Sequence, residues 1–318
     1  MLGLCMGTAQ VHAAPWVPSS DSEIVETLPT VSGWSREERA RRRALVASPR
    51  DETVALAAAR SYLDIARAQG DARFAGYAAG ALRPWEPLTA QTPNAVLVMH
   101  ATVAQFLHDF DGAERTLLLA LGANPSNAQG WLTLATIRRV RGRYAESDAA
   151  CQSLVRLRQN LYAIACLAEN NGLRGNHSDA RQAIEGLLAS PSLQTADQSA
   201  TRQWLMATIA EIDELAGQSR AADAAYRKTL GANASAYDVI AYSDFLLGQK
   251  RPADVLPVLK SEPRSDAVLL RWVIASQRLD AEGKLSPAQR ETARQDRVEL
   301  AARFDASALR PGTQTQHA

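Results

Sequence analysis

A pattern of apolar and small residues recurs along the middle of the chain every 33 to 34 residues. Equivalent units begin near Asn94, Ala128 and Leu161, which are 34 and 33 residues apart. Each unit holds two apolar-periodic segments of about a dozen residues, joined by a short turn that contains Gly or Asp. A period of this length is typical of helical hairpins that stack on one another, because a single hairpin cannot bury its apolar face alone.

The unit that starts at Ala128 shows how each hairpin is built. Trp131 and Leu134 lie on one face of a first helix. Ala135 is small enough to let a second helix approach, and we expect it to be buried where the two helices cross. Gly142 ends the first helix, since a left-handed residue costs glycine nothing. Ser147 and Cys151 are small residues on the second helix, at the point of closest approach.

These residues resemble the tetratricopeptide repeat (TPR), whose consensus is W-x2-L-G-x2-Y, a turn glycine, and A-x3-F-x2-A-L-x3-P. The stretch ALGANP, residues 120–125, matches the end of the consensus in full, and Trp131, Leu134, Gly142 and Tyr144 match the earlier part. The chain departs from the consensus at Ala135 (for Gly), Arg138 (for Tyr) and Cys151 (for Phe). Three consecutive units in phase make the resemblance specific.

The resemblance covers about Asp51 to Pro263 and implies an all-α, right-handed superhelical solenoid of five to six TPR-like hairpins. The unit that carries Trp204 has a first helix about two residues longer than the standard one. In the last unit we expect Gly248 to form the turn and Pro257 to shorten or kink the second helix. A further helix that opens at Ser286 should cap the stack at its C-terminal end.

The chain therefore divides into four parts. Residues 1–14 resemble a secretory signal that lacks its basic start, and residues 15–50 hold an extended segment and a short basic helix. That helix should begin near Arg36, because Ser35 and Glu38 form the pattern of a capping box. Residues 51–304 form the TPR-like repeat domain, and residues 305–318 are expected to be a disordered tail.

The leader predicts a periplasmic or otherwise exported protein, and a cytosolic leader with a cytoplasmic location is the alternative. A lipoprotein anchor at Cys5 is disfavoured, because Leu4 is larger than the residue that usually precedes such a cysteine. Cleavage at Ala14 or Pro15 would leave Cys151 and Cys166. These two are either buried free thiols or, in an oxidising compartment, a disulfide between neighbouring helices.

Composition excludes several classes of function. Lys and Arg number 35 and Asp and Glu 34, which gives a net charge of +1 and no global field for nucleic acid. No apolar run approaches the roughly 20 residues of a membrane-spanning helix, so none is expected in the mature chain. The sequence holds no phosphate-binding, nucleophile-elbow or zinc motif. We therefore expect no enzymatic activity, no catalytic or metal-binding residue and no cofactor.

In the family, ligands lie in a concave groove that the first helix of each hairpin lines. The resemblance places Gln129, Arg139, Tyr162, Glu169 and Arg202 in this groove. We expect an extended partner segment whose acidic groups reach two cations, Arg139 and Arg202, roughly 20 Å apart. An apolar residue of the partner would lie on Tyr162, between the two cations.

The predicted function is a non-enzymatic scaffold or adaptor that binds a partner peptide or protein in the groove. The alternatives are a non-catalytic subunit that completes or regulates a partner enzyme, and a structural module that self-associates weakly. The identity of the partner is not encoded in any motif of the sequence.

Overall fold

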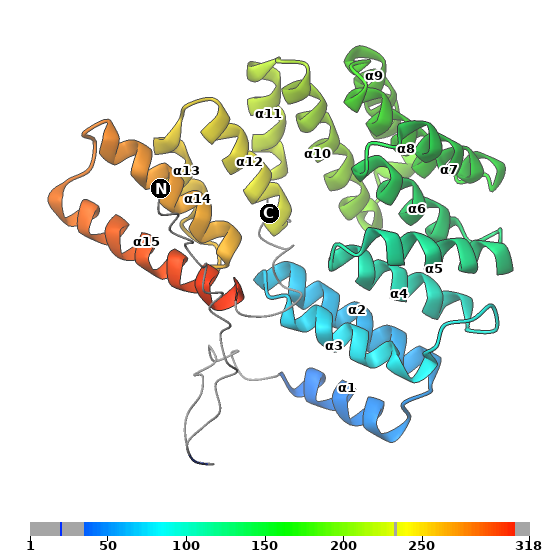
Figure 1. The fold of residues 1–318 in the computed structure, drawn as a ribbon. Coiled ribbons are helices and arrows are strands. Elements are labelled where there is room, and N and C mark those ends of the chain that lie inside the picture. Colours follow the sequence, from blue (N-terminus) through cyan, green and yellow to red (C-terminus); the bar gives the residue numbers. More distant parts are fainter. Residues whose placement is uncertain (1–19, 21–34, 232–233, 309–318) are drawn as a thin grey trace, which may run out of the picture.

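A computed structural model describes residue 20, residues 35–231 and residues 234–308 of the chain. All regular elements in these residues are helices. They form seven antiparallel pairs that follow a short first helix, α1 (Arg36–Ala47), along an arc (Figure 1). The pairs are α2 (Glu52–Gln69) with α3 (Arg73–Leu82), α4 (Asn94–Phe106) with α5 (Phe110–Ala123), α6 (Ala128–Val140) with α7 (Tyr144–Arg156), α8 (Asn160–Leu173) with α9 (His177–Leu188), α10 (Ser199–Leu215) with α11 (Ser219–Thr229), α12 (Ala236–Gly248) with α13 (Pro252–Leu259), and α14 (Asp266–Ala281) with α15 (Pro287–Ala308). Three short 3-10 helices, η1 (Arg83–Trp85), η2 (Pro191–Leu193) and η3 (Ala196–Gln198), lie in the connections. The predicted all-α helical-repeat solenoid is confirmed.

The number of pairs is larger than the five to six expected. The predicted capping helix is α15, and α14 pairs with it to form a seventh hairpin that the repeat pattern did not reveal. These two helices have 16 and 22 residues, so they depart from the repeat length, although Gly283 makes their turn with φ +69°. Helix α15 also runs to Ala308, four residues into the expected tail. The leader (1–14), the extended segment as far as residue 34 apart from Ser20, and the tail beyond 308 lie outside the described residues.

Both helix starts that were read from capping patterns occur as expected. Helix α1 begins at Arg36 behind a capping box in which the Ser35 side chain accepts from the Glu38 backbone N–H. Ser286 and Gln289 exchange the same pair of bonds at the start of α15. Local side-chain chemistry alone sets these two boundaries.

The contact inside the third hairpin depends on small residues. Ala135 on α6 and Ser147 on α7 are both completely buried, and the Ser147 hydroxyl donates to the Ala135 carbonyl oxygen at 2.8 Å. Gly142 makes the turn between them with φ +73°, as predicted. The prediction for Gly248 is wrong, because this residue ends α12 and Lys250 adopts the left-handed conformation instead. A lysine in this conformation has a steric cost that glycine avoids. The turn nevertheless forms with Lys250, so a glycine is not required at this position.

Two irregular pairs also match their sequence patterns. Helix α10 has 17 residues, against 13 or 14 in α4, α6 and α8, so it is longer as expected but by three or four residues and not about two. Helix α13 has only 8 residues and contains Pro257. Proline removes a helical hydrogen bond and clashes with the preceding turn, which accounts for the short helix. The longer α10 matters for the site described below.

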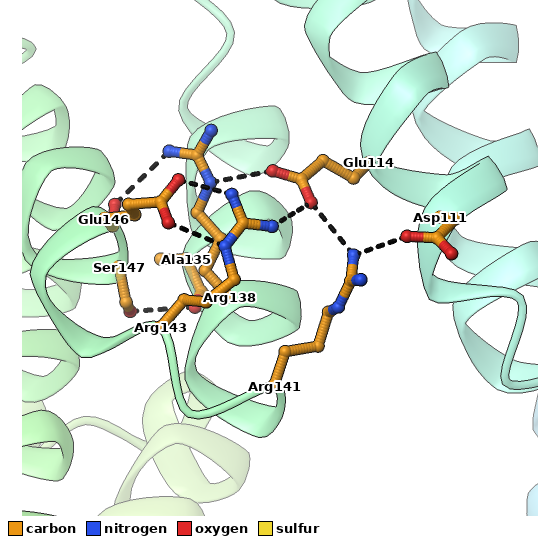
Figure 2. A network of polar contacts seen from close by, with 8 residues as sticks. All are labelled: Asp111, Glu114, Ala135, Arg138, Arg141, Arg143, Glu146 and Ser147. Atoms are coloured by element: carbon orange, nitrogen blue, oxygen red, sulfur yellow. Dashed lines mark hydrogen bonds and ion pairs between the residues drawn. The ribbon is translucent and has the colours of Figure 1, made fainter.

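Arginine and glutamate side chains join consecutive pairs (Figure 2). Glu114 on α5 accepts hydrogen bonds from Arg138 Nε at 3.0 Å, Arg141 Nη1 at 3.2 Å and Arg143 Nη1 at 2.6 Å. Burial by itself would raise the pKa of Glu114, but the hydrogen bonds from Arg143 and Arg138 outweigh it, so this pKa is lowered. Arg143 also bonds Glu146 at the start of α7. This network fixes the second and third hairpins relative to each other.

A disulfide joins the third and fourth hairpins. Cys151 on α7 and Cys166 on α8 are bonded, with their Cα atoms 5.8 Å apart and both side chains fully buried. Of the two states that the sequence left open, the structure contains the oxidised one.

The two ends of the array meet (Figure 1). Gly70, at the end of α2, lies so close to α14 that a Cβ atom built on it would stand 2.8 Å from Cβ of Ser265. Next to this contact, Arg67 and Phe106 from the first two hairpins and Arg271 and Phe304 from the last line a cavity of about 600 Å³. We call the contact between Gly70 and Ser265 the seam. It turns an open row of hairpins into a closed array.

Replacing Gly70 should open the seam. Gly70→Ala places a methyl group against Ser265, whereas Gly142→Ala has the same left-handed backbone (φ +64° and +73°) and nothing within 4 Å of the new atom. Both variants should lose about 1–2 kcal/mol from backbone strain. Only Gly70→Ala should also raise the radius of gyration in small-angle X-ray scattering. Equal scattering curves for the two variants would show that the ends do not touch in solution.

A pocket on the inner helices

The first helices of four consecutive hairpins enclose a cavity of about 710 Å³. Arg139 on α6, Glu169 on α8, several residues of α10 and Tyr237 on α12 line it. We call it the inner pocket. Because α10 is longer than its neighbours, one of its faces runs the length of the pocket, with Trp204, Glu211 and Leu215 at helical spacing.

Large apolar side chains surround the inner pocket without being covered. Leu173 is 45% exposed, Leu215 52% and Tyr237 62%. Trp204 lies among them and is half-buried, with its ring 6.4 Å from that of Tyr162 and nearly parallel to it. Apolar groups that gather around a cavity in this way are typical of interaction sites.

The charged groups of the pocket include one ion pair, and the other two carboxylates of the lining, Glu211 and Asp238, form no ion pair within the described residues. Arg139 Nη1 lies 2.5 Å from Glu169 Oε2, and both side chains are mostly buried. Glu169 also accepts from Trp204 Nε1 at 3.3 Å. The carboxylate of Glu211 accepts a short hydrogen bond from the Tyr237 hydroxyl. Among the residues that the structure describes, no Lys, Arg or His forms an ion pair with Glu211.

The environment disfavours negative charge on both glutamates. Burial raises the pKa of Glu169, and Glu211 adds to the shift, although Arg139 opposes it. Burial likewise raises the pKa of Glu211, against the opposing effects of the Tyr237 hydrogen bond and Arg139. The hydroxyl of Tyr237 is held in its neutral form, because desolvation at the hydroxyl end of this otherwise exposed side chain and the neighbouring Glu211 both raise its pKa. The ionised form of both carboxyl groups is therefore costly in the pocket, and Arg139 only partly offsets this cost.

The start of α12 fixes the position of Tyr237. Ser235 and Asp238 form a capping box, in which Asp238 accepts from the Ser235 backbone N–H at 2.8 Å and from its hydroxyl at 2.7 Å. Gln203 of α10 donates to the same carboxylate at 3.2 Å. The backbone that carries Tyr237 is thus tied to α10, across the pocket.

The structure brings three of the five predicted groove residues together. Arg139 and Glu169 line the inner pocket and bind each other, and Tyr162 joins them through its ring contact with Trp204. Gln129 lies apart and donates to Thr133 Oγ1 at 3.2 Å. Arg202 donates to the carbonyl oxygens of Leu193 and of Thr195, the latter at 2.6 Å, and so ties down the connection before α10. Both predicted cations already have partners within the protein.

Sequence reasoning missed Trp204, Glu211, Leu215 and Leu173 as lining residues. A signal was present for the first three, because their spacing of seven and four residues places them on one face of α10. In the sequence, this pattern is also typical of the buried core of a repeat. Only the length of α10 in the structure shows that the face lines a pocket.

Comparisons with known proteins give similar folds at low identity. No family model matches the sequence, and no curated protein matches it. A tetratricopeptide repeat protein from Parabacteroides merdae ATCC 43184 is similar over 77% of this chain and 93% of its own, with 12% identity and a TM-score of 0.47. MamA covers 61% of this chain and 96% of its own (16% identity, TM-score 0.34). The APC/C hetero-tetramer Cut9–Hcn1 covers 77% and 51% (14% identity, TM-score 0.33).

At these TM-scores the class of the protein rests on its own architecture. Helix pairs that repeat at 33 to 34 residues, with small residues at the crossing and a left-handed turn, define a TPR-like helical-repeat solenoid. In the described part of the chain, no helix combines the length and apolar character needed to span a membrane, and no group of three metal-ligating side chains occurs.

Removing the charge of Glu211 should stabilise the unliganded protein. Because its folded pKa is raised, the stability associated with the neutral carboxyl is complete below the unfolded pKa and is lost as pH rises through the folded pKa. Glu211→Gln keeps an acceptor for Tyr237 but cannot ionise. Urea unfolding should therefore give a higher free energy for the variant at about pH 8, and a difference that shrinks toward zero near about pH 4. A difference that does not change with pH would rule out this explanation.

Proposed function

We propose that the protein is a non-enzymatic scaffold or adaptor that binds a segment of a partner protein in the inner pocket. The observation that carries the proposal is the set of uncovered apolar side chains, Leu173, Leu215 and Tyr237, around a cavity of about 710 Å³ on the first helices. A cavity of this size is within the range of ligand sites. Its helices belong to four hairpins, so a bound segment would be held by several repeats at once.

Paired surface substitutions test this function. Leu173→Ser with Leu215→Ser removes two exposed apolar groups from the pocket, and Val140→Ser with Val155→Ser removes two groups of similar exposure that do not line it. Each double variant should stay folded, because exposed sites usually change stability by no more than about 0.5 kcal/mol per substitution. Partners retrieved from the source organism and identified by mass spectrometry should be lost with the first pair only. Retention of every partner by the pocket variant would refute the proposal.

We also propose that the protein works outside the cytoplasm. The leader pattern supports this location, and so does the disulfide between Cys151 and Cys166, because disulfides persist mainly in oxidising compartments.

The redox state and the N-terminus of native protein test this location. Protein taken from its source and alkylated in denaturant without reductant should carry no label on Cys151 or Cys166, and its sequence should begin at Ala14 or Pro15. Two labelled cysteines on a chain that starts at Met1 would instead indicate the cytoplasm.

A further inference from the structure

The charge balance of the inner pocket indicates what kind of group it can receive. Arg139 pairs with Glu169 at 2.5 Å, and in the described structure neither of the other two carboxylates of the lining, Glu211 and Asp238, forms an ion pair with a cation. Asp238 is buried and accepts hydrogen bonds from Ser235 and Gln203. Glu211 is the carboxylate of the two that is only partly buried. An acidic ligand would meet this negative charge without a free cation to offset it. The ligand expected from the sequence, with acidic groups on Arg139 and Arg202, therefore does not suit the pocket.

The shape of the pocket adds a second constraint. Glu211 lies between apolar groups of its own helix, with Trp204 two turns before it and Leu215 one turn after it. Tyr237, which bonds Glu211, presents an aromatic ring that is mostly exposed. A long aliphatic stem can lie along such apolar walls while a charged end reaches the carboxylate, and an aromatic ring attracts a cation further. Lysine and arginine side chains have this construction.

We propose that the inner pocket receives a lysine or arginine side chain of the partner segment, with its cation on Glu211 and its aliphatic stem against Trp204 and Leu215. This inference rests on the proposed function and specifies the chemistry of the partner. The cation would complete the charge balance that the unliganded protein lacks. It would also convert a costly carboxylate into one half of a mostly buried, hydrogen-bonded pair, the stronger kind of polar contact.

The inner pocket would recognise one basic residue of the partner and not a large basic surface on it. The chain as a whole is nearly neutral, so long-range attraction contributes little. Selectivity then comes from one desolvated charge and the apolar groups around it, as at the centre of a protein interface.

Peptides selected on the folded protein provide the probe. A displayed library of random dodecapeptides is panned on the wild-type chain, and the affinity of each selected peptide is measured by fluorescence anisotropy. We expect the peptides that depend on Leu173 and Leu215 to share a Lys or Arg. Replacing it with the neutral isostere norleucine or citrulline should weaken binding about 10- to 100-fold.

A double-mutant cycle assigns the charge to Glu211. In Glu211→Gln the neutral and basic peptides should bind with nearly equal affinity, because the partner charge is gone. Glu214→Gln is the matched control: it removes the same charge from the next turn of α10, where Glu214 bonds Tyr226 at 2.6 Å and does not line the pocket. That variant should keep the full preference for the basic residue.

The outcomes separate the two proposals. Peptides that require Leu173 and Leu215 but carry no basic residue, or that ignore Glu211→Gln, would overturn the inference and leave the pocket as the binding site. Failure to select any peptide that depends on the two leucines would count against the proposed function itself. Displacement of the basic peptides by spermidine with similar affinity would overturn the choice of a polypeptide side chain and indicate a free polyamine.

Discussion

A single helical hairpin of this chain cannot bury its own apolar surface, and every other feature follows from the need to stack on a neighbour. The buried core of the described residues is accordingly a series of clusters along the array, four of them shared by adjacent hairpins and one within the last hairpin. Ala135 and Ser147 keep one hairpin thin at its crossing, and the arginines around Glu114 set the angle to the hairpin before it. The inner helices inherit their spacing from these contacts, and the spacing creates the pocket.

Two features of the inner pocket reduce the stability of the unliganded protein and would favour the proposed binding. Burial of a carboxylate without a cation is unfavourable, as the raised pKa of Glu211 indicates. A neutral residue, or a cation beside Glu211, would make the unliganded protein more stable. Covering apolar side chains such as Leu215 would have the same effect. Both features sit on α10, the helix that departs most from the repeat in length among the inner helices of the pocket. In this chain the departure of α10 from the repeat length thus coincides with the proposed binding surface.

The fold was largely predictable from the sequence, because its determinants are local. Gly142, the capping box at Ser35 and the short helix around Pro257 each act within a few residues. The seventh hairpin was not predicted, because α14 and α15 have the turn glycine of the repeat but not its helix lengths. Seven hairpins in place of five or six also changed what the ends of the array can touch.

The candidate site was predictable only in part, because it depends on side-chain directions. The repeat phase placed Arg139 and Glu169 correctly on inner helices, yet it could not show that they bind each other. Arg202 occupies an equivalent helix but turns to the carbonyl oxygens of Leu193 and Thr195. A periodic pattern gives the face of a helix; it does not give the rotamer of a long cation with several acceptors in reach. For this reason the ligand charge proposed from the structure is opposite to the one expected from the sequence.

The seam between Gly70 and Ser265 makes the number of hairpins a fixed property of the molecule. An open solenoid can gain or lose a repeat during evolution and simply become longer or shorter. In a closed array an added hairpin would carry the last helices past the first ones, and a deleted hairpin would leave them apart. Duplication or deletion of a hairpin would therefore break the seam, whereas substitutions within existing hairpins would leave it intact.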